Sequence, residues 1–177
     1  MGADHAVTAV LLDRDGTINV KAPEGDYITA PDRLDLLPGA AGAIARLNRA
    51  EIPVAVVTNQ RGVALRRMTP DDLTAVHRRM NELLADEAGA HVDAYFVCPH
   101  EHGECDCRKP APGLLLKAAA AFELADLTGS VMVGDSVSDV AAGRAAGART
   151  VLVGERDDSG ADHVAPSLAE AVSWLLD

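Results

Sequence analysis

The chain has 177 residues, of which 48% are hydrophobic and 24% are charged, and this is the size and balance of one compact globular domain spanning residues 1–177. Its formal net charge is −11, and no block of Lys and Arg is interleaved with aromatic residues, which argues against nucleic acid as a partner. Only 3% of the residues are aromatic, so the core must come from Ala, Val, Leu and Ile, as in a buried parallel sheet under alanine-rich helices.

The sequence carries no sign of a membrane or export signal. The stretch Met1–Thr8 lacks the basic start and long apolar run of a signal peptide, and no apolar stretch approaches the roughly 18 residues of a spanning helix. We therefore expect a cytoplasmic protein with no membrane partner, and separately we expect it to be a monomer. An acidic protein repels phosphorylated ligands at long range, so a phosphate site here would need a metal ion and local cations.

Apolar runs and amphipathic stretches alternate along the first half of the chain, which predicts strands and helices in turn. The second helix has a clear start, because Thr69 is a good N-cap residue, Pro70 suits the first helical position and acidic residues follow in the first turn. The predicted order is strand, helix, strand, helix, strand, at residues Ala6–Leu12, Ala40–Ala50, Ile52–Val57, Thr69–Glu87 and Val92–Val97.

The second half continues the same alternation. Its predicted order is helix, strand, helix, strand, helix, at residues Pro112–Leu124, Ser130–Gly134, Ser136–Ala146, Arg149–Val153 and Pro166–Leu176. Trp174 and the pair Leu175-Leu176 are expected in the core of the last helix. Alternating β and α units of this length predict an α/β fold with a doubly wound, Rossmann-like parallel sheet and helices on both faces.

Polar residues stand where the predicted strands end. Asp13 and Asp15 follow the first strand, Thr58 and Asn59 follow the second, and Asp135 follows the fourth. Ligands of doubly wound sheets bind at the carboxyl ends of the strands, so these residues are expected to form one site. Carboxylates this close call for a cation, and Mg²⁺ prefers hard oxygen ligands, which makes Asp13, Asp15 and Asp135 candidate magnesium ligands.

The same residues offer the parts that phosphoryl transfer needs, namely a nucleophile, an acid for the leaving oxygen and positive charge around the phosphoryl oxygens. Asp13 can attack phosphorus. Asp15 can protonate the leaving alcohol and then activate the water that hydrolyses the intermediate. The hydroxyl of Thr58 and the ammonium of Lys109 can donate to the transferring phosphoryl group.

A cluster of Cys and His residues lies directly ahead of Arg108 and Lys109, and it predicts a structural zinc site in loop 98–107 that would hold these two cations in place. The candidate ligands form C-x-H and C-x-C pairs, and they are Cys98, His100, Cys105 and Cys107. The alternatives are free cysteines or a disulfide between Cys105 and Cys107, and His102 competes with His100 as a ligand. No chemistry is assigned to the remaining histidines, which are expected at surface or helix positions: His5, His77, His91 and His163.

The ordered segments DRDGT, VVTNQ, CRKP and VGDSVSD resemble the four motifs of the haloacid dehalogenase superfamily of phosphatases. The added pattern CPH followed by CDC, just ahead of CRKP, is similar to the class IIIA members that have no large cap domain. That class holds D-glycero-D-manno-heptose 1,7-bisphosphate phosphatases and histidinol-phosphate phosphatases. The match runs from Val10 to Asp139 and into the following strand.

The resemblance implies a role for most of the candidate site residues. Asp13 would be the nucleophile and Asp15 the general acid and base, with Thr58 and Lys109 on the phosphoryl group. Magnesium would be held by Asp13, Asp135 and the backbone carbonyl of Asp15. The implied substrate contacts are Arg108, Asn59 and the loop Glu24–Tyr27, in particular Asp26 and Tyr27. Ser136 departs from the resemblance, because heptose phosphatases tend to carry a lysine at this position.

The expected reaction is hydrolysis of heptose 1,7-bisphosphate at C7, favoured by the segment Asn19-Val20 after DRDGT and by the pair Asp26-Tyr27. Histidinol phosphate is the alternative substrate, because the short interval between His100 and Cys105 resembles the compact zinc loop of those enzymes. A phospho-acceptor receiver or a non-catalytic binding module is the alternative of another class. Receivers, however, use a lone aspartate after a middle strand, whereas here paired aspartates follow the first.

Overall fold

A computed structural model describes residues 6–155 and 159–177, so the start of the chain and part of the loop Gly154–Asp162 lie outside the described residues. Its centre is a sheet of six strands in the order β3-β2-β1-β4-β5-β6, and every neighbouring pair is parallel. The strands are β1 Val10–Leu12, β2 Val54–Asn59, β3 Ala94–Cys98, β4 Val131–Gly134, β5 Arg149–Val153 and β6 His163–Ala165. The predicted doubly wound parallel sheet is confirmed.

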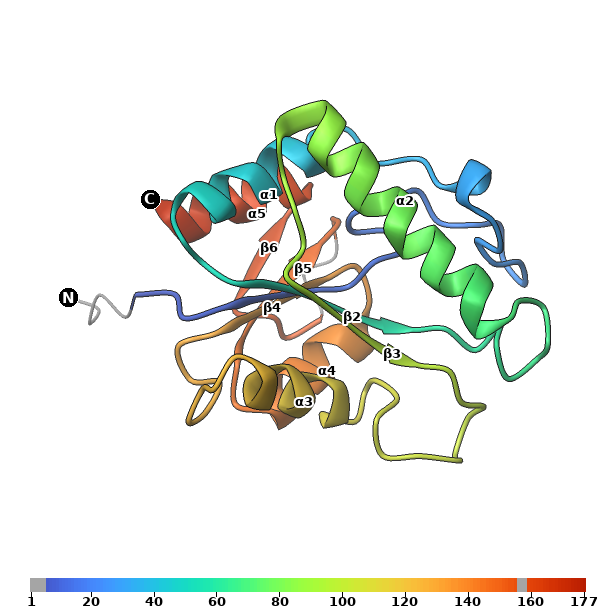
Figure 1. Ribbon diagram of the computed structural model, residues 1–177. Helices are drawn as coiled ribbons and strands as arrows, with labels where there is room; N and C mark the ends of the chain where they lie inside the picture. Colours follow the sequence, from blue (N-terminus) through green and yellow to red (C-terminus); the bar gives the residue numbers. More distant parts are fainter. Residues whose placement is uncertain (1–5, 156–158) are drawn as a thin grey trace.

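Helices cover both faces of this sheet (Figure 1). On one face lie α1 Ala40–Arg49, α2 Pro70–Ala88 and α5 Leu168–Leu176, and on the other α3 Gly113–Ala121 and α4 Val137–Ala145. The side chains of β1 alternate between the two layers, because Val10 and Leu12 join the core under α1 and α5, whereas Leu11 joins the core under α3. All three are fully buried, as expected for a central parallel strand.

The helix starts follow local capping chemistry. Thr69 caps α2 and Ser136 caps α4, and each forms a reciprocal capping box with the aspartate three residues later, Asp72 and Asp139. The predicted Thr69 start is therefore confirmed. Of the helices in the described part of the chain, none is long and apolar enough to cross a membrane.

Two short elements were not predicted: β6, and a 3₁₀ turn at Pro31–Arg33. Each has only three residues, too few for a period to show. The placement of Trp174 in the core was wrong. Its side chain is 40% exposed and stacks on His163 of the edge strand, with ring centroids 4.3 Å apart. The buried stripe of α5 runs instead through Leu168, Ala171 and Val172.

Candidate active site

The site lies at the carboxyl edge of the sheet, where β1, β2 and β4 end side by side. Lys109 is its centre. Its ammonium donates to Asp13 Oδ1 at 2.7 Å and to the carbonyl of Val57 at 2.8 Å, and it pairs with Asp139 Oδ1 at 2.6 Å. Lys109 is 4% exposed and Asp139 is 2% exposed, so this is a buried cation between two carboxylates.

Asn59 places Lys109 through the backbone. Its side-chain amide donates to the carbonyl of Lys109 at 3.0 Å, and its side-chain oxygen accepts from the backbone N–H of Lys109 at 3.1 Å. The end of β2 thus holds the loop that brings Lys109 to the end of β1. The substrate contact predicted for Asn59 stays a prediction, and what the structure gives its side-chain amide is this hold on the Lys109 backbone.

For both Asp13 and Lys109, burial and the neighbouring charges shift the pKa in opposite directions. Burial raises the pKa of Asp13, although the charge of Lys109 acts to lower it. Burial acts to lower the pKa of Lys109, but the charges of Asp13 and Asp139 outweigh it, so the pKa of Lys109 lies above its usual value. Lys109 therefore stays charged, and further positive charge beside Asp13 would favour its anionic, nucleophilic form.

Asp15 is held by a set of donors on both of its oxygens. Oδ1 accepts from Arg14 Nη2 at 3.0 Å and from Asn19 Nδ2 at 2.9 Å, and Oδ2 accepts from Gln60 Nε2 at 2.8 Å. The Gln60 amide also lies 2.9 Å from the buried hydroxyl of Thr58. Burial would raise the pKa of Asp15, but the charge of Arg14 and these hydrogen bonds outweigh it and lower the pKa. Asp15 is therefore a carboxylate in the free protein.

Three carboxylates can hold a metal ion at this edge. The ligand atoms of Asp13, Asp135 and Asp139 lie within 4.8 Å of one another, and Asp135 Oδ1 is buried with no hydrogen-bond partner among the described residues. An orphaned carboxylate oxygen is costly unless a cation or water satisfies it. Gly16 and Gly134 permit this crowding, because a Cβ on Gly16 would collide with Asp135 and a Cβ on Gly134 would collide with Asp139. The donor set is all oxygen, as Mg²⁺ prefers.

Lys21 is a cation that the sequence did not single out. Its ammonium pairs with Asp135 Oδ2, and its side chain is 53% exposed. Burial acts to lower the pKa of Lys21, but the hydrogen bond and charge of Asp135, with smaller contributions from Asp13 and Asp139, outweigh it and raise the pKa. The Lys21 ammonium is thus attracted to the same three carboxylates that can hold a metal ion.

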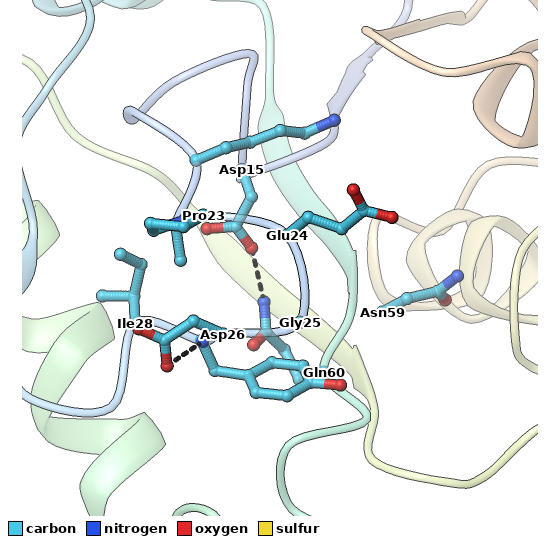
Figure 2. Close-up of a pocket in the computed structure, with 11 residues that line it drawn as sticks. Asp15, Pro23, Glu24, Gly25, Asp26, Ile28, Asn59 and Gln60 are labelled. Carbon is cyan, nitrogen blue, oxygen red and sulfur yellow. Dashed lines mark hydrogen bonds between the residues drawn. The ribbon is translucent and has the colours of Figure 1, made fainter.

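A cavity of about 290 Å³ opens beside Asp15, and Figure 2 shows the side chains around it. The segment Lys21–Ile28 forms one wall, and Asn59 and Gln60 form the other. Three of the predicted substrate contacts, Asn59, Asp26 and Tyr27, therefore line this cavity. Arg108 is not among its lining residues, and its Nη2 lies 3.5 Å from His102 on the cysteine-bearing loop.

The cysteine-bearing loop brings its candidate ligands together. The sulfurs of Cys98 and Cys107 lie 3.5 and 3.4 Å from the sulfur of Cys105. The Nδ1 of His100 lies 3.4 Å from the Cys107 sulfur. These separations are slightly shorter than those between ligands of a tetrahedral zinc ion, about 3.8 Å between two sulfurs and about 3.6 Å between a sulfur and a nitrogen. All three cysteines are free thiols, so the alternative Cys105–Cys107 disulfide is not formed. His102 lies outside the described cluster, which favours His100.

Sequence reasoning left out several residues that complete the site. Asp139, to which the sequence alone assigns no role, is the buried partner of Lys109. Arg14 and Gln60 donate hydrogen bonds to Asp15. Both lie within the predicted motifs, but the sequence analysis assigns roles only to the residues next to them. His77, predicted at a surface or helix position with no chemistry, lies on α2 and is buried against Arg14. The i, i+3 and i+4 spacing of His77 with buried Leu73 and Met80 was the available signal.

Comparison with known proteins identifies the family of this chain. The family model of haloacid dehalogenase-like hydrolases matches residues 3–147. A D-glycero-beta-D-manno-heptose-1,7-bisphosphate 7-phosphatase of Pseudomonas aeruginosa is 42% identical over 81% of this chain and 79% of its own length. A D-glycero-alpha-D-manno-heptose-1,7-bisphosphate 7-phosphatase of Mycobacterium tuberculosis is 39% identical over 74% of this chain and 68% of its own length.

A solved structure extends the similarity over almost the whole chain. It is the D,D-heptose 1,7-bisphosphate phosphatase of Bordetella bronchiseptica, crystallised with magnesium and phosphate. It superposes with a TM-score of 0.86 at 36% identity and covers 96% of this chain and 98% of its own. The chain belongs to the haloacid dehalogenase-like hydrolases.

Proposed function

We propose that this protein is a magnesium-dependent phosphatase that removes the C7 phosphate of D-glycero-D-manno-heptose 1,7-bisphosphate through an aspartyl-phosphate on Asp13. The observation that carries the proposal is the geometry around Asp13, which has a buried ammonium on one carboxylate oxygen and a second, firmly held carboxylate, Asp15, two residues further along the chain. The names of the similar proteins support the substrate.

In the first step a carboxylate oxygen of Asp13 attacks phosphorus, and the bond between phosphorus and the sugar oxygen breaks. Asp15 gives a proton to that leaving oxygen. Lys109 and the hydroxyl of Thr58 stabilise the charge on the phosphoryl oxygens. In the second step Asp15 takes a proton from water as the water oxygen attacks phosphorus, the bond from phosphorus to Asp13 breaks, and inorganic phosphate leaves.

Asp15 must bind a proton before it can act as the acid. Arg14, Asn19 and Gln60 keep its pKa low in the free protein. A phosphate group in the cavity would bring negative charge beside it, which favours the protonated form. The same donors then favour its return to the carboxylate, the form that accepts the proton of water in the second step.

We propose Asp13, Asp135 and the backbone carbonyl of Asp15 as the protein ligands of magnesium. When bound, the ion neutralises negative charge on the substrate phosphate and on Asp13. The unpaired Asp135 Oδ1 and the all-oxygen donor set fit this ion. Asp139 shares the cluster, but its two oxygens are already used by Lys109 and by the capping box of Ser136, so it acts on Lys109.

Lys21 should weaken magnesium binding, because its ammonium occupies Asp135 Oδ2. Replacing it in Lys21→Met should therefore tighten Mg²⁺ binding to the free protein by about two- to fivefold, the range of a partly exposed ion pair. Isothermal titration calorimetry without substrate measures this directly. Lys21→Arg keeps the charge and serves as the control, and weaker binding by Lys21→Met would contradict the competition.

We further propose that Lys21, once displaced from Asp135, faces the second phosphate of the substrate. It is the one Lys or Arg among the residues that line the described cavity, and Glu24 and Asp26 on the same wall are acidic. A bisphosphate needs a cation at its far end to be held there. This places the C1 phosphate toward the loop Lys21–Tyr27 and the C7 phosphate at Asp13.

We propose a structural zinc ion in loop 98–107, bound by Cys98, His100, Cys105 and Cys107. Four protein ligands leave no position for water, so this zinc has no catalytic task and contributes folding energy to the loop. Lys109 follows the last cysteine by two residues, and its ammonium reaches Asp13. The ion would thus keep the Lys109 backbone in register with Asn59.

Cys107→Ser should lose zinc, lower the melting temperature and reduce turnover by about a hundredfold, because a small displacement of Lys109 costs this much. Zinc content by mass spectrometry, thermal unfolding and steady-state rates report the three effects, and excess magnesium should not rescue the rate. His102→Ala, in the same loop but outside the cluster, should keep its zinc. Wild-type protein purified without chelators that is zinc-free and fully active would contradict the proposal.

The substrate is tested by comparing specificity constants on a panel. Both anomers of heptose 1,7-bisphosphate, fructose 1,6-bisphosphate, histidinol phosphate and an aryl phosphate should be assayed with magnesium. We expect the heptose bisphosphate to exceed the others by at least about tenfold, a difference of about 1.4 kcal/mol. A higher constant for histidinol phosphate would reassign the substrate, and no turnover on any compound would favour a binding module.

We also propose that residues 1–177 act as one domain, in the cytoplasm and as a monomer.

A further inference from the structure

Arg14 is a fully buried charged residue for which the proposed reaction has no direct use. It stands between Asp13 and Asp15, is fully buried, does not line the cavity and reaches His77 of α2. Its Nη2 and Nε donate to Asp15 Oδ1 at 3.0 and 3.3 Å. Its Nη1 lies 3.2 Å from the Nε2 of His77. The guanidinium therefore connects the proposed acid and base to helix α2.

His77 is fixed from its far side as well. Its ring stacks on Tyr95 of β3, with centroids 4.4 Å apart and an angle of 17° between the planes. The Tyr95 hydroxyl donates in turn to Asn81 Oδ1 at 3.0 Å. His77 is 8% exposed, and burial together with the charge of Arg14 lowers its pKa to about 3. The imidazole is thus neutral, and its Nε2 accepts the hydrogen bond from Arg14.

We propose that His77 is a positioning residue, whose Nε2 fixes the guanidinium of Arg14 and thereby holds the Asp15 carboxylate where it can transfer protons. This inference rests on the proposed phosphatase reaction. A planar guanidinium with partners on two edges cannot rotate about its own bonds without losing one of them. Without an acceptor at position 77, the buried Nη1 would be unpaired and Arg14 would turn to find another partner.

Two variants separate the acceptor from the ring. His77→Phe keeps an aromatic ring to stack on Tyr95 and removes the acceptor, whereas His77→Gln removes the ring and offers an amide oxygen in place of Nε2. Tyr95→Phe is the matched control, because it breaks the outer hydrogen bond to Asn81 and leaves the contact between His77 and Arg14. Thermal unfolding of each variant reports any general loss of structure.

The leaving group distinguishes a displaced Asp15 from a merely loosened protein. A sugar alcohol needs a proton from Asp15 to leave, whereas an aryl oxide such as 4-nitrophenolate leaves without one. We expect His77→Phe to lower kcat/KM by about tenfold or more for the sugar bisphosphate and by less than about threefold for 4-nitrophenyl phosphate. Because hydrolysis of the aspartyl-phosphate also uses Asp15, the phosphorylated fraction during aryl phosphate turnover should rise. His77→Gln should restore most of the rate.

The outcomes are distinct. Equal losses on both substrates in His77→Phe, or full activity on both, would overturn the role of His77. So would a Tyr95→Phe variant with the same selective loss on the sugar, because that variant keeps the contact between His77 and Arg14 and breaks only the hydrogen bond from Tyr95 to Asn81. A wild-type protein that turns over neither substrate would contradict the proposed phosphatase, and the inference on His77 would fall with it.

Discussion

Asp13→Asn is expected to lose at least about 10⁴-fold in turnover, more than about 5 kcal/mol of transition-state stabilisation, while the protein stays folded. An amide of the same shape cannot attack phosphorus and is a poorer magnesium ligand. It can still accept the hydrogen bond that Lys109 donates to Asp13 Oδ1. Steady-state rates with the sugar bisphosphate and with 4-nitrophenyl phosphate measure the loss, and circular dichroism and thermal unfolding check the fold.

The control for this variant is Asp86→Asn, which makes the same change at an exposed position of α2 away from the site. It should be as active as the wild type. Activity of Asp13→Asn within about tenfold of the wild type, near 1.4 kcal/mol, would remove Asp13 from the nucleophile role.

Lys109→Met should lose both activity and stability, and the second effect separates it from Asp13→Asn. The apolar side chain leaves Asp13 and Asp139 as two buried carboxylates without a cation, and it also leaves the Val57 carbonyl without its donor. Breaking a buried charge pair in this way costs about 3 to 5 kcal/mol. The free energy of unfolding in urea, measured without added metal, gives this cost.

Lys117→Met is the matched control, because Lys117 is exposed on α3. Its stability should change by less than about 0.5 kcal/mol. Equal free energies of unfolding for Lys109→Met and Lys117→Met would contradict the stabilising role of the buried cluster of Lys109, Asp13 and Asp139.

Much of the fold was predictable, because its elements are long enough to show a period or carry local signals. Thr69 marked the start of α2 by its own capping chemistry, and the apolar run before Asp13 marked the central strand. The rule that ligands bind at the carboxyl ends of parallel strands then grouped Asp13, Thr58 and Asp135 correctly at one edge. The predicted family and the hydrolase class are confirmed.

The partners within the site were not predictable, because they depend on side chains that meet only after folding. In the sequence, Asp139 cannot be distinguished from a solvated helix residue. Its buried partner Lys109 lies 30 residues earlier, in a loop, and the two meet only in the folded protein. His77 and Arg14 are 63 residues apart in the chain and meet only when α2 has packed on its face of the sheet. Trp174 has a large apolar side chain of the kind found in cores, but this side chain packs beside the edge strand β6 and is partly exposed.

The central claim, an aspartyl-phosphate on Asp13, is tested most directly by trapping the intermediate. Asp15→Asn should slow hydrolysis of the phosphoenzyme more than its formation from 4-nitrophenyl phosphate, so the phosphorylated protein should accumulate. Acid quenching followed by peptide mapping in a mass spectrometer should then find one phosphoryl group, on Asp13, and none in the double variant Asp13→Asn, Asp15→Asn. A phosphoryl group on another residue, or wild-type turnover with no phosphorylated protein at any time, would contradict the account.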